Sequence, residues 1–307
     1  PLFCAGDFEK AVNALQSASS VVIMTGFVIP AVDQPENDGP VGAVSIAAAL
    51  ASLGKHVSIL SSALNEPVVT ACVSFAAELY PAAQGINICS ADSEIAPLQW
   101  LESHGSQLFP HTINIADSVL LTIELPGPGA SGICHNMRGV PIPEHRAFLH
   151  GYFSAMTQKW PQLQTIGIGD GGNEVGMGKV RPLVEVHVAE GSTIACHLST
   201  DYLIVSGVSN WAGYALHLAL FPPPPPPSND GTQKENEKET LTSAAQAAYL
   251  AWERQLLQVA GNAGAVDGVF ATRGIPHHGG DSMDGILWND HVPVIEALFH
   301  SLCGGRP

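Results

Sequence analysis

The chain has 307 residues, of which 46% are hydrophobic and only 13% are charged, a composition that supports a substantial core and excludes a disordered protein. Its 12 basic and 28 acidic residues give a net charge of −16 without any basic cluster, which argues against a nucleic-acid or anionic membrane partner. No uninterrupted apolar run reaches the length of a membrane span, and we therefore expect a soluble protein.

Short apolar runs alternate with longer helical stretches along the chain. The first predicted strand, 21–24, is followed by a predicted helix over 41–53, and the second, 57–60, by a helix over 67–80. The third strand, 86–89, precedes a helix over 95–102, and the fourth, 119–123, precedes a long helix over 143–160. The fifth and sixth strands are predicted at 165–168 and 202–205, with a helix that starts at Lys179 between them.

These runs are continuously apolar, as expected for strands that are buried on both faces. The pattern predicts an α/β fold, with a three-layer, doubly wound, mainly parallel sheet of about six strands and helices on both faces. We expect residues 1–307 to form a single domain, with a flexible proline-rich insertion at about 222–240. Two further helices are predicted over 241–259 and 292–302.

The most informative motif is the glycine-rich stretch 167–178, which follows the fifth strand. Six of its twelve residues are glycine, and its reactive side chains are Asp170, Asn173 and Glu174. Because ligands of open α/β sheets bind beyond the carboxyl ends of the strands, this loop is the predicted catalytic centre. Its two carboxylates would repel a phosphate, so an ammonium group, a metal cation or a proton in transit suits the loop better. The alternative is a polar turn that caps the following helix.

Other strand ends supply the predicted substrate-binding residues. Asp38 could bind a substrate ammonium or cap a helix, and Arg138 could hold a carboxylate with its forked guanidinium or lie on the surface. Ser209 and Asn210 begin the helix after the sixth strand, where they could act as caps or as substrate donors. The remaining candidates lie at strand ends or in the glycine-rich loop: Thr25, Gly26, Glu124, Gly171 and Gly172.

Together these segments resemble the C-terminal, catalytic domain of the D-glutamate cyclase family. The resemblance rests on the glycine-rich stretch and on segments 25–27, 37–40, 136–138, 206–214 and 284–285. It implies an enzyme, a hydro-lyase that converts D-glutamate into 5-oxo-D-proline and water. It also implies a mitochondrial location for the animal members and a second domain before this one. A homo-oligomer is possible on sequence grounds.

Closing the lactam ring requires a base, an acid and an anchor for the α-carboxylate. Asp170 and Glu174 are the predicted acid and base, and Arg138 is the predicted anchor. A divalent cation such as Mn²⁺ or Mg²⁺ would bind oxygen ligands, for which Asp170, Glu174 and Asp38 are the candidates, although no cofactor is certain. Two other functions stay open: a phosphate- or nucleotide-binding enzyme, and a catalytically inactive amino-acid-binding relative.

Overall fold

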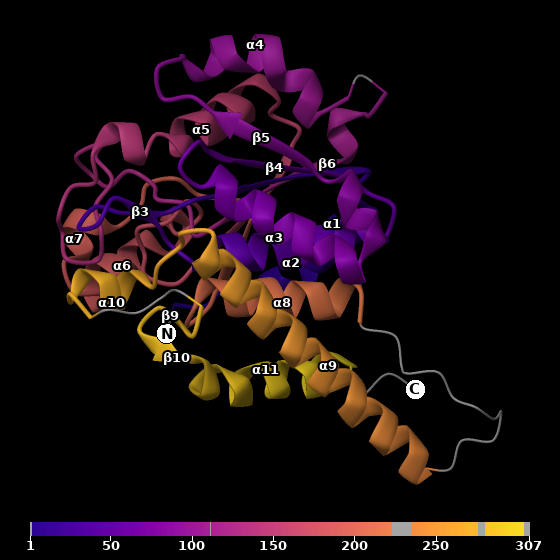
Figure 1. Ribbon diagram of the computed structural model, residues 1–307. Coiled ribbons are helices and arrows are strands. Elements are labelled where there is room, and N and C mark those ends of the chain that lie inside the picture. Colours follow the sequence, from indigo (N-terminus) through magenta and orange to yellow (C-terminus); the bar gives the residue numbers. More distant parts are fainter. Residues whose placement is uncertain (1, 111, 223–234, 276–279, 304–307) are drawn as a thin grey trace.

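The computed structural model describes residues 2–110, 112–222, 235–275 and 280–303 (Figure 1). Six strands form one sheet in the order β5-β4-β1-β6-β7-β8, and all of its neighbouring strands are parallel. Along the chain this order is third, second, first, fourth, fifth and sixth, so the predicted doubly wound topology is confirmed. The strands are β1 (Ser20–Thr25), β4 (His56–Ser62), β5 (Asn87–Ala91), β6 (Ser118–Ile123), β7 (Gln164–Gly169) and β8 (Tyr202–Val205).

The sheet is buried on both faces because its strands point apolar side chains in both directions. In β1, Val21 and Ile23 pack into one hydrophobic cluster, while Val22 and Met24 pack into another on the opposite face. Helices α1 (Asp7–Ser17), α2 (Pro40–Ser52), α3 (Glu66–Leu79) and α8 (Ser209–Leu220) cover the first face. Helices α4 (Pro97–Leu108) and α5 (Leu149–Lys159) cover the second.

Two more helices lie outside the first face and thicken that side of the molecule. Helix α9 (Glu235–Asn262) packs on α2 and α3, and α11 (Trp288–Cys303) packs on α8 (Figure 1). The remaining elements are short: hairpins β2 (Val28–Ile29) with β3 (Gln34–Pro35) and β9 (Ser282–Met283) with β10 (Ile286–Leu287), and helices α6 (Arg181–His187), α7 (Gly191–Ile194) and α10 (Gly268–Thr272). None of the described helices is both long enough and apolar enough to cross a membrane.

Two predicted helices need correction, and one helix was not predicted. The helix predicted over 143–160 is wrong in its first part, where a single 3₁₀ turn (Glu144–Arg146) precedes α5, because Ala147 leaves the helical region with φ −118° and ψ 26°. The helix predicted from Lys179 starts as a 3₁₀ turn (Gly178–Val180) and becomes α6 only at Arg181. Helix α1 was not predicted from the sequence. In the structure, buried Asp7 ties it to the sheet by accepting hydrogen bonds from Lys179 Nζ and Leu203 N.

The predicted insertion at about 222–240 lies mostly outside the described residues, which stop at residue 222 and resume at 235. Helix α9 begins at Glu235 and continues to Asn262. Residues 235–240 of the predicted insertion thus belong to α9, which starts six residues before the helix predicted over 241–259.

Helices α2 and α8 cross at a close contact between two glycines. A Cβ atom on Gly213 would lie 2.7 Å from Gly42 Cα, and a Cβ atom on Gly42 would lie 2.7 Å from Asn210 Oδ1. Both obstacles belong to groups that the surrounding structure holds in place, so neither can move away cheaply. This contact fixes the starts of α2 and α8 beside each other, and both helix starts adjoin the site described below.

We expect Gly213→Ala to lower the free energy of unfolding by about 1–3 kcal/mol, because the added methyl group forces the two backbones apart. Chemical denaturation measures the change. Gly105→Ala in α4 is the matched control, since its Cβ atom would meet the Trp160 ring at an ordinary 3.4 Å. The control should be neutral or gain up to about 1 kcal/mol from helix propensity. Equal effects of the two substitutions would contradict the role of the glycine contact.

Candidate active site

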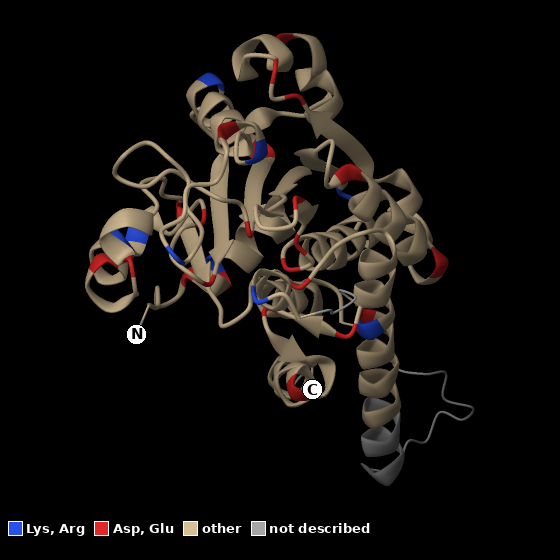
Figure 2. Ribbon diagram, turned by 60° about the vertical axis from the view of Figure 1, so that its left-hand side comes forward, with Lys and Arg blue, Asp and Glu red and all other residues tan. Residues whose placement is uncertain are grey.

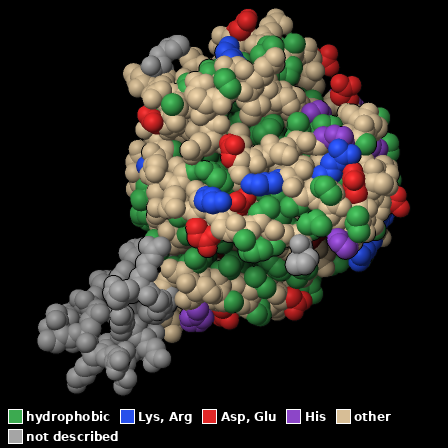
Figure 3. Space-filling view, turned by 180° about the vertical axis from the view of Figure 1, so that it is seen from behind, with side chains coloured by type: hydrophobic (Ala, Val, Ile, Leu, Met, Phe, Trp, Pro, Cys, Tyr) green, Lys and Arg blue, Asp and Glu red, His purple; other side chains and the backbone are tan. Residues whose placement is uncertain are grey.

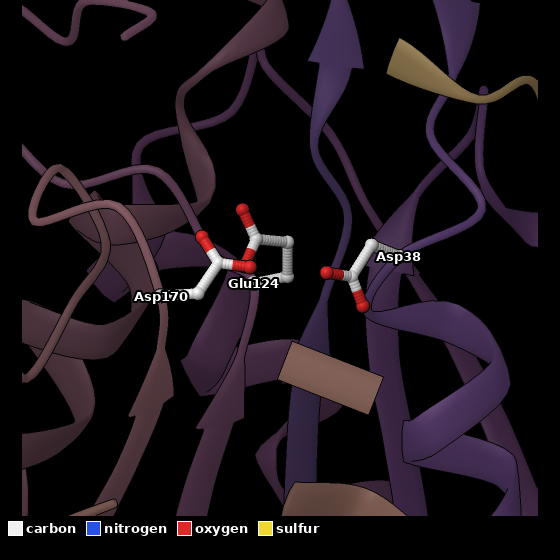
Figure 4. Close-up of side chains that lie close together, drawn as sticks. All are labelled: Asp38, Glu124 and Asp170. Carbon is white, nitrogen blue, oxygen red and sulfur yellow. The ribbon is translucent and has the colours of Figure 1, made fainter. Parts of the chain in front are cut away.

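Three carboxylates that are far apart in the sequence meet at the carboxyl ends of the central strands. Glu124 directly follows β6 and Asp170 directly follows β7, while Asp38 lies between the β2–β3 hairpin and α2. They therefore gather where β1 and β6 lie side by side and the strand order reverses, which is where doubly wound sheets bind ligands. Figure 4 shows Glu124 and Asp170 next to each other, with Asp38 facing them from the other side.

Oxygen atoms from Asp38, Glu124 and Asp170 all lie within 4.8 Å of one another. Three hard oxygen ligands at this spacing suit either a divalent cation or a substrate ammonium. Glu124 also has a positive φ of 47°, a costly conformation for a residue with a side chain. Such strain concentrates at functional sites, where the surrounding structure maintains it.

The site orients these carboxylates with backbone amides from the start of α8. Asp38 accepts hydrogen bonds from Asn210 N at 2.8 Å and from Ser209 N at 3.0 Å. Ser209 N also lies 3.2 Å from Asp170 Oδ2, and Ser209 Oγ donates to Glu124 Oε2 at 2.5 Å. A single serine at a helix start therefore contacts all three carboxylates and fixes their relative positions.

The environment favours the protonated form of these acids. Burial raises the pKa of Asp38 to about 6, even though three backbone N–H groups lower it. Burial, followed by repulsion from neighbouring carboxylates, raises the pKa of Glu124 and of Asp170 well above the usual range. Near neutral pH such a group of acids contains both proton donors and proton acceptors, as acid–base chemistry requires.

Glu174 was predicted as an acid–base residue and cation ligand, but its carboxylate binds backbone amides of its own loop. Its Oε1 accepts a hydrogen bond from Gly171 N and its Oε2 accepts one from Gly172 N, both at 2.8 Å. The side chain is only 1% exposed, so it holds the glycine-rich loop closed from within. This geometry favours an organising role for Glu174, and it is Glu124 that joins Asp38 and Asp170 in the three-carboxylate cluster.

We expect Glu174→Gln to cost about 1–3 kcal/mol of stability, because the amide turns an N–H group toward a backbone N–H and leaves a buried donor without a partner. Urea denaturation of the variant measures this cost. Asp170→Asn, in the same loop, is the control and should not share it. A Glu174→Gln protein as stable as the parent chain would contradict the organising role.

The other predicted residues surround the cluster. Asn210 is fully buried and accepts hydrogen bonds from Gly39 N and Gly42 N, and Asn173 Nδ2 donates to the His135 carbonyl. Thr25 and Gly26 lie at the end of β1, where Thr25 Oγ1 is buried without a hydrogen-bond partner among the described residues. Of the predicted residues, six line the cavity beside the cluster: Asp38, Glu124, Arg138, Asp170, Asn173 and Glu174. The others are not part of this lining: Thr25, Gly26, Gly171, Gly172, Ser209 and Asn210.

The cavity has a volume of about 220 Å³, and a distant part of the chain builds one of its walls. This wall, formed by residues 266–275 and 280–285, packs on the loop after β1: Asn37 N donates to the Val266 carbonyl, and Asn37 Nδ2 donates to the Ser282 carbonyl. It brings Thr272, Arg273 and Asp284 into the cavity. Burial raises the pKa of Asp284 to about 7. Figure 2 shows several acidic positions on the loops in the middle of the molecule.

Residues that were not predicted to form the site include Glu36, Arg273 and Asp284. Glu36 stands two residues before Asp38, and Asp284-Gly285 is one of the segments that carry the family resemblance, so both had a signal in the sequence. Arg273 had none, because only the packing of the wall on the loop places it in the cavity.

Comparison with known proteins identifies the family of the chain. Residues 1–299 match the model of the D-glutamate cyclase-like C-terminal family. The chain is 35% identical to the human (Homo sapiens) protein "D-glutamate cyclase, mitochondrial", in an alignment that covers 72% of this chain and 35% of the human protein. The matched region therefore spans about a third of that relative's length. From the family match over nearly its whole length, the chain belongs to the D-glutamate cyclase-like C-terminal domain family.

Proposed function

We propose that this chain catalyses the intramolecular dehydration of D-glutamate to 5-oxo-D-proline and water, a reversible reaction. The observation that carries the proposal is the cluster of Asp38, Glu124 and Asp170, three carboxylates within 4.8 Å at the point where the strand order reverses. The activity in the human relative's name agrees with it. We extend the mitochondrial location in that name to this chain as part of the proposal.

The reaction requires proton transfer between two atoms of the substrate. The α-ammonium loses one proton, its nitrogen attacks the γ-carboxyl carbon, and the new bond forms as a carbon–oxygen bond breaks. The nitrogen then loses a second proton, and the leaving oxygen departs as water with two protons. No proton is gained or lost overall, so a set of acids that can both accept and donate near neutral pH is suited to this transfer. Asp38, with a pKa of about 6, and Asp170 beside it fit these roles.

The cluster also favours a cation over an anion. Several buried acids line the cavity, including Glu36, Asp38 and Glu124, so a phosphate group in its interior would meet strong repulsion. This charge disfavours the phosphate- or nucleotide-binding alternative. A substrate ammonium or a divalent cation such as Mn²⁺ or Mg²⁺ would balance the charge of the carboxylates. The experiment below distinguishes the two.

The decisive experiment incubates the purified chain with D-glutamate, L-glutamate and each enantiomer of 5-oxoproline, and follows interconversion by chiral chromatography. Turnover confined to the D series is the expected result. Parallel reactions with EDTA and with added Mn²⁺ test the cation. A folded protein that binds D-glutamate without turnover would favour the inactive amino-acid-binding alternative, and one that binds none of these ligands would refute the proposal.

A further inference from the structure

The cavity is divided by charge between its interior and its mouth. Its interior holds the buried carboxylates, whereas Arg138 and Arg273 line it with exposed side chains. Among the described residues, neither guanidinium takes part in an ion pair. In a chain with 12 basic and 28 acidic residues, two unpaired arginines in one cavity are a marked local exception. Figure 3 shows basic and acidic side chains side by side near the middle of one face of the molecule.

The two arginines come from separate parts of the chain. Arg138 follows β6 in a turn where Asn136 Oδ1 accepts hydrogen bonds from Arg138 N and Val140 N. Arg273 directly follows α10 as its C-cap, and its backbone N–H donates to the carbonyls of Val269 and Phe270. Each guanidinium therefore extends from a hydrogen-bonded backbone, which limits the entropy lost when it binds an anion.

Helix α10 is itself held firmly against the acidic side of the cavity. Asp267 caps its start by accepting a hydrogen bond from Phe270 N at 3.0 Å, and it also binds Gly285 N. Gly268 lies so close to Glu36 that an added Cβ atom would overlap the Glu36 carboxylate. The position of Arg273 relative to the carboxylates is thus set by several contacts, although Arg273 touches none of them.

We propose that Arg273 is a specificity-determining residue that binds the substrate's α-carboxylate together with Arg138. This inference rests on the proposed function. The ammonium and the γ-carboxyl group exchange protons and must lie at the acid cluster. The α-carboxylate keeps its charge from substrate to product and must lie away from the acids, which leaves the arginines at the mouth. A planar guanidinium binds both oxygens of a carboxylate and so orients the α-carbon.

The test compares two substrates that differ only at this group. D-Isoglutamine carries a neutral α-carboxamide but keeps the ammonium and the γ-carboxylate of D-glutamate. We expect Arg273→Gln to lower kcat/KM for D-glutamate by roughly tenfold or more, mainly through KM, and to leave kcat/KM for D-isoglutamine within about twofold. Arg273→Lys, which keeps the charge but loses the fork, should fall between the two. Arg254→Gln, an exposed arginine outside the cavity, is the matched control and should change neither value.

The two proposals fail in different ways. If the parent chain turns over D-glutamate and Arg273→Gln affects both substrates equally or neither, the role of Arg273 is refuted while the proposed function stands. If the folded parent chain acts on neither substrate and does not bind 5-oxo-D-proline in a calorimetric titration, the proposed function is refuted and this inference with it.

Discussion

Asp170→Asn should reduce the turnover of D-glutamate by about 10²–10⁴-fold while the protein stays folded, because positioned acid–base groups contribute about that much. Asp170 lies within 4.8 Å of the Asp38 and Glu124 carboxylates, and its pKa is raised by burial and then by repulsion from Glu124. Asparagine keeps the shape of the side chain and loses only the exchangeable proton and charge. Steady-state kinetics with chiral detection of 5-oxo-D-proline measures the loss.

The control for this substitution is Asp117→Asn. Asp117 is exposed and directly precedes β6, so it lies at the opposite edge of the sheet from the cluster. Its replacement should leave turnover unchanged. If Asp170→Asn keeps full activity in a folded protein, proton transfer does not depend on this cluster as proposed, and the assignment of Asp170 is wrong.

The second large effect concerns stability and pH. A carboxyl group whose pKa is higher in the folded than in the unfolded state stabilises the fold at low pH, and this stability is lost as pH rises through the folded value. Burial raises the pKa of Asp38 from 3.8 to about 6 and that of Asp284 from 3.8 to about 7. The ligand-free protein should therefore lose a few kcal/mol of unfolding free energy between about pH 4 and pH 7 from these groups, since one pKa unit corresponds to about 1.4 kcal/mol.

The comparison of the parent chain with Asp170→Asn tests the same kind of effect at Asp170, whose pKa is raised by burial and then by repulsion from Glu124, Glu174 and Asp38. The two should be closest in stability at low pH, because a raised pKa favours the protonated carboxyl group, which asparagine imitates. As pH rises toward 8 the variant should become the more stable protein, because it lacks the carboxyl group whose ionisation burial and neighbouring carboxylates oppose. Urea denaturation at pH 5 and pH 8 measures the difference in unfolding free energy between the two proteins. A variant that is no more stable than the parent chain at pH 8 would contradict the raised pKa of Asp170.

Much of this fold could be predicted because its signals are local. The six strands are continuous apolar runs bounded by turns, and a run such as 21–24 can only be satisfied in a sheet that is covered on both faces. The positions of Asp38, Glu124 and Asp170 after three separate strands then brought them together at one edge, because parallel strands end on the same side.

What could not be predicted depends on tertiary packing. Arg273 and Asp284 enter the cavity only because residues 266–275 and 280–285 pack on the loop after β1. This contact joins residues more than 200 positions apart, for which the sequence has no periodic signal. The organising role of Glu174 was missed for a related reason. Its two oxygens meet backbone amides only once the glycine-rich loop has taken its folded path, and a carboxylate in a sequence does not show whether it faces a ligand or its own backbone.

The position of the cavity wall near the end of the sequence has a consequence for synthesis on the ribosome. All six sheet strands and all three cluster carboxylates have been translated by residue 205, whereas the wall residues 266–275 and 280–285 are translated at least 61 residues later. Until then, Asp38, Glu124 and Asp170 face water on the side that this wall later covers, and hydration offsets their mutual repulsion. The nascent chain can thus assemble its sheet while the acids are still solvated, and the cost of enclosing them arises only when the last part of the chain docks.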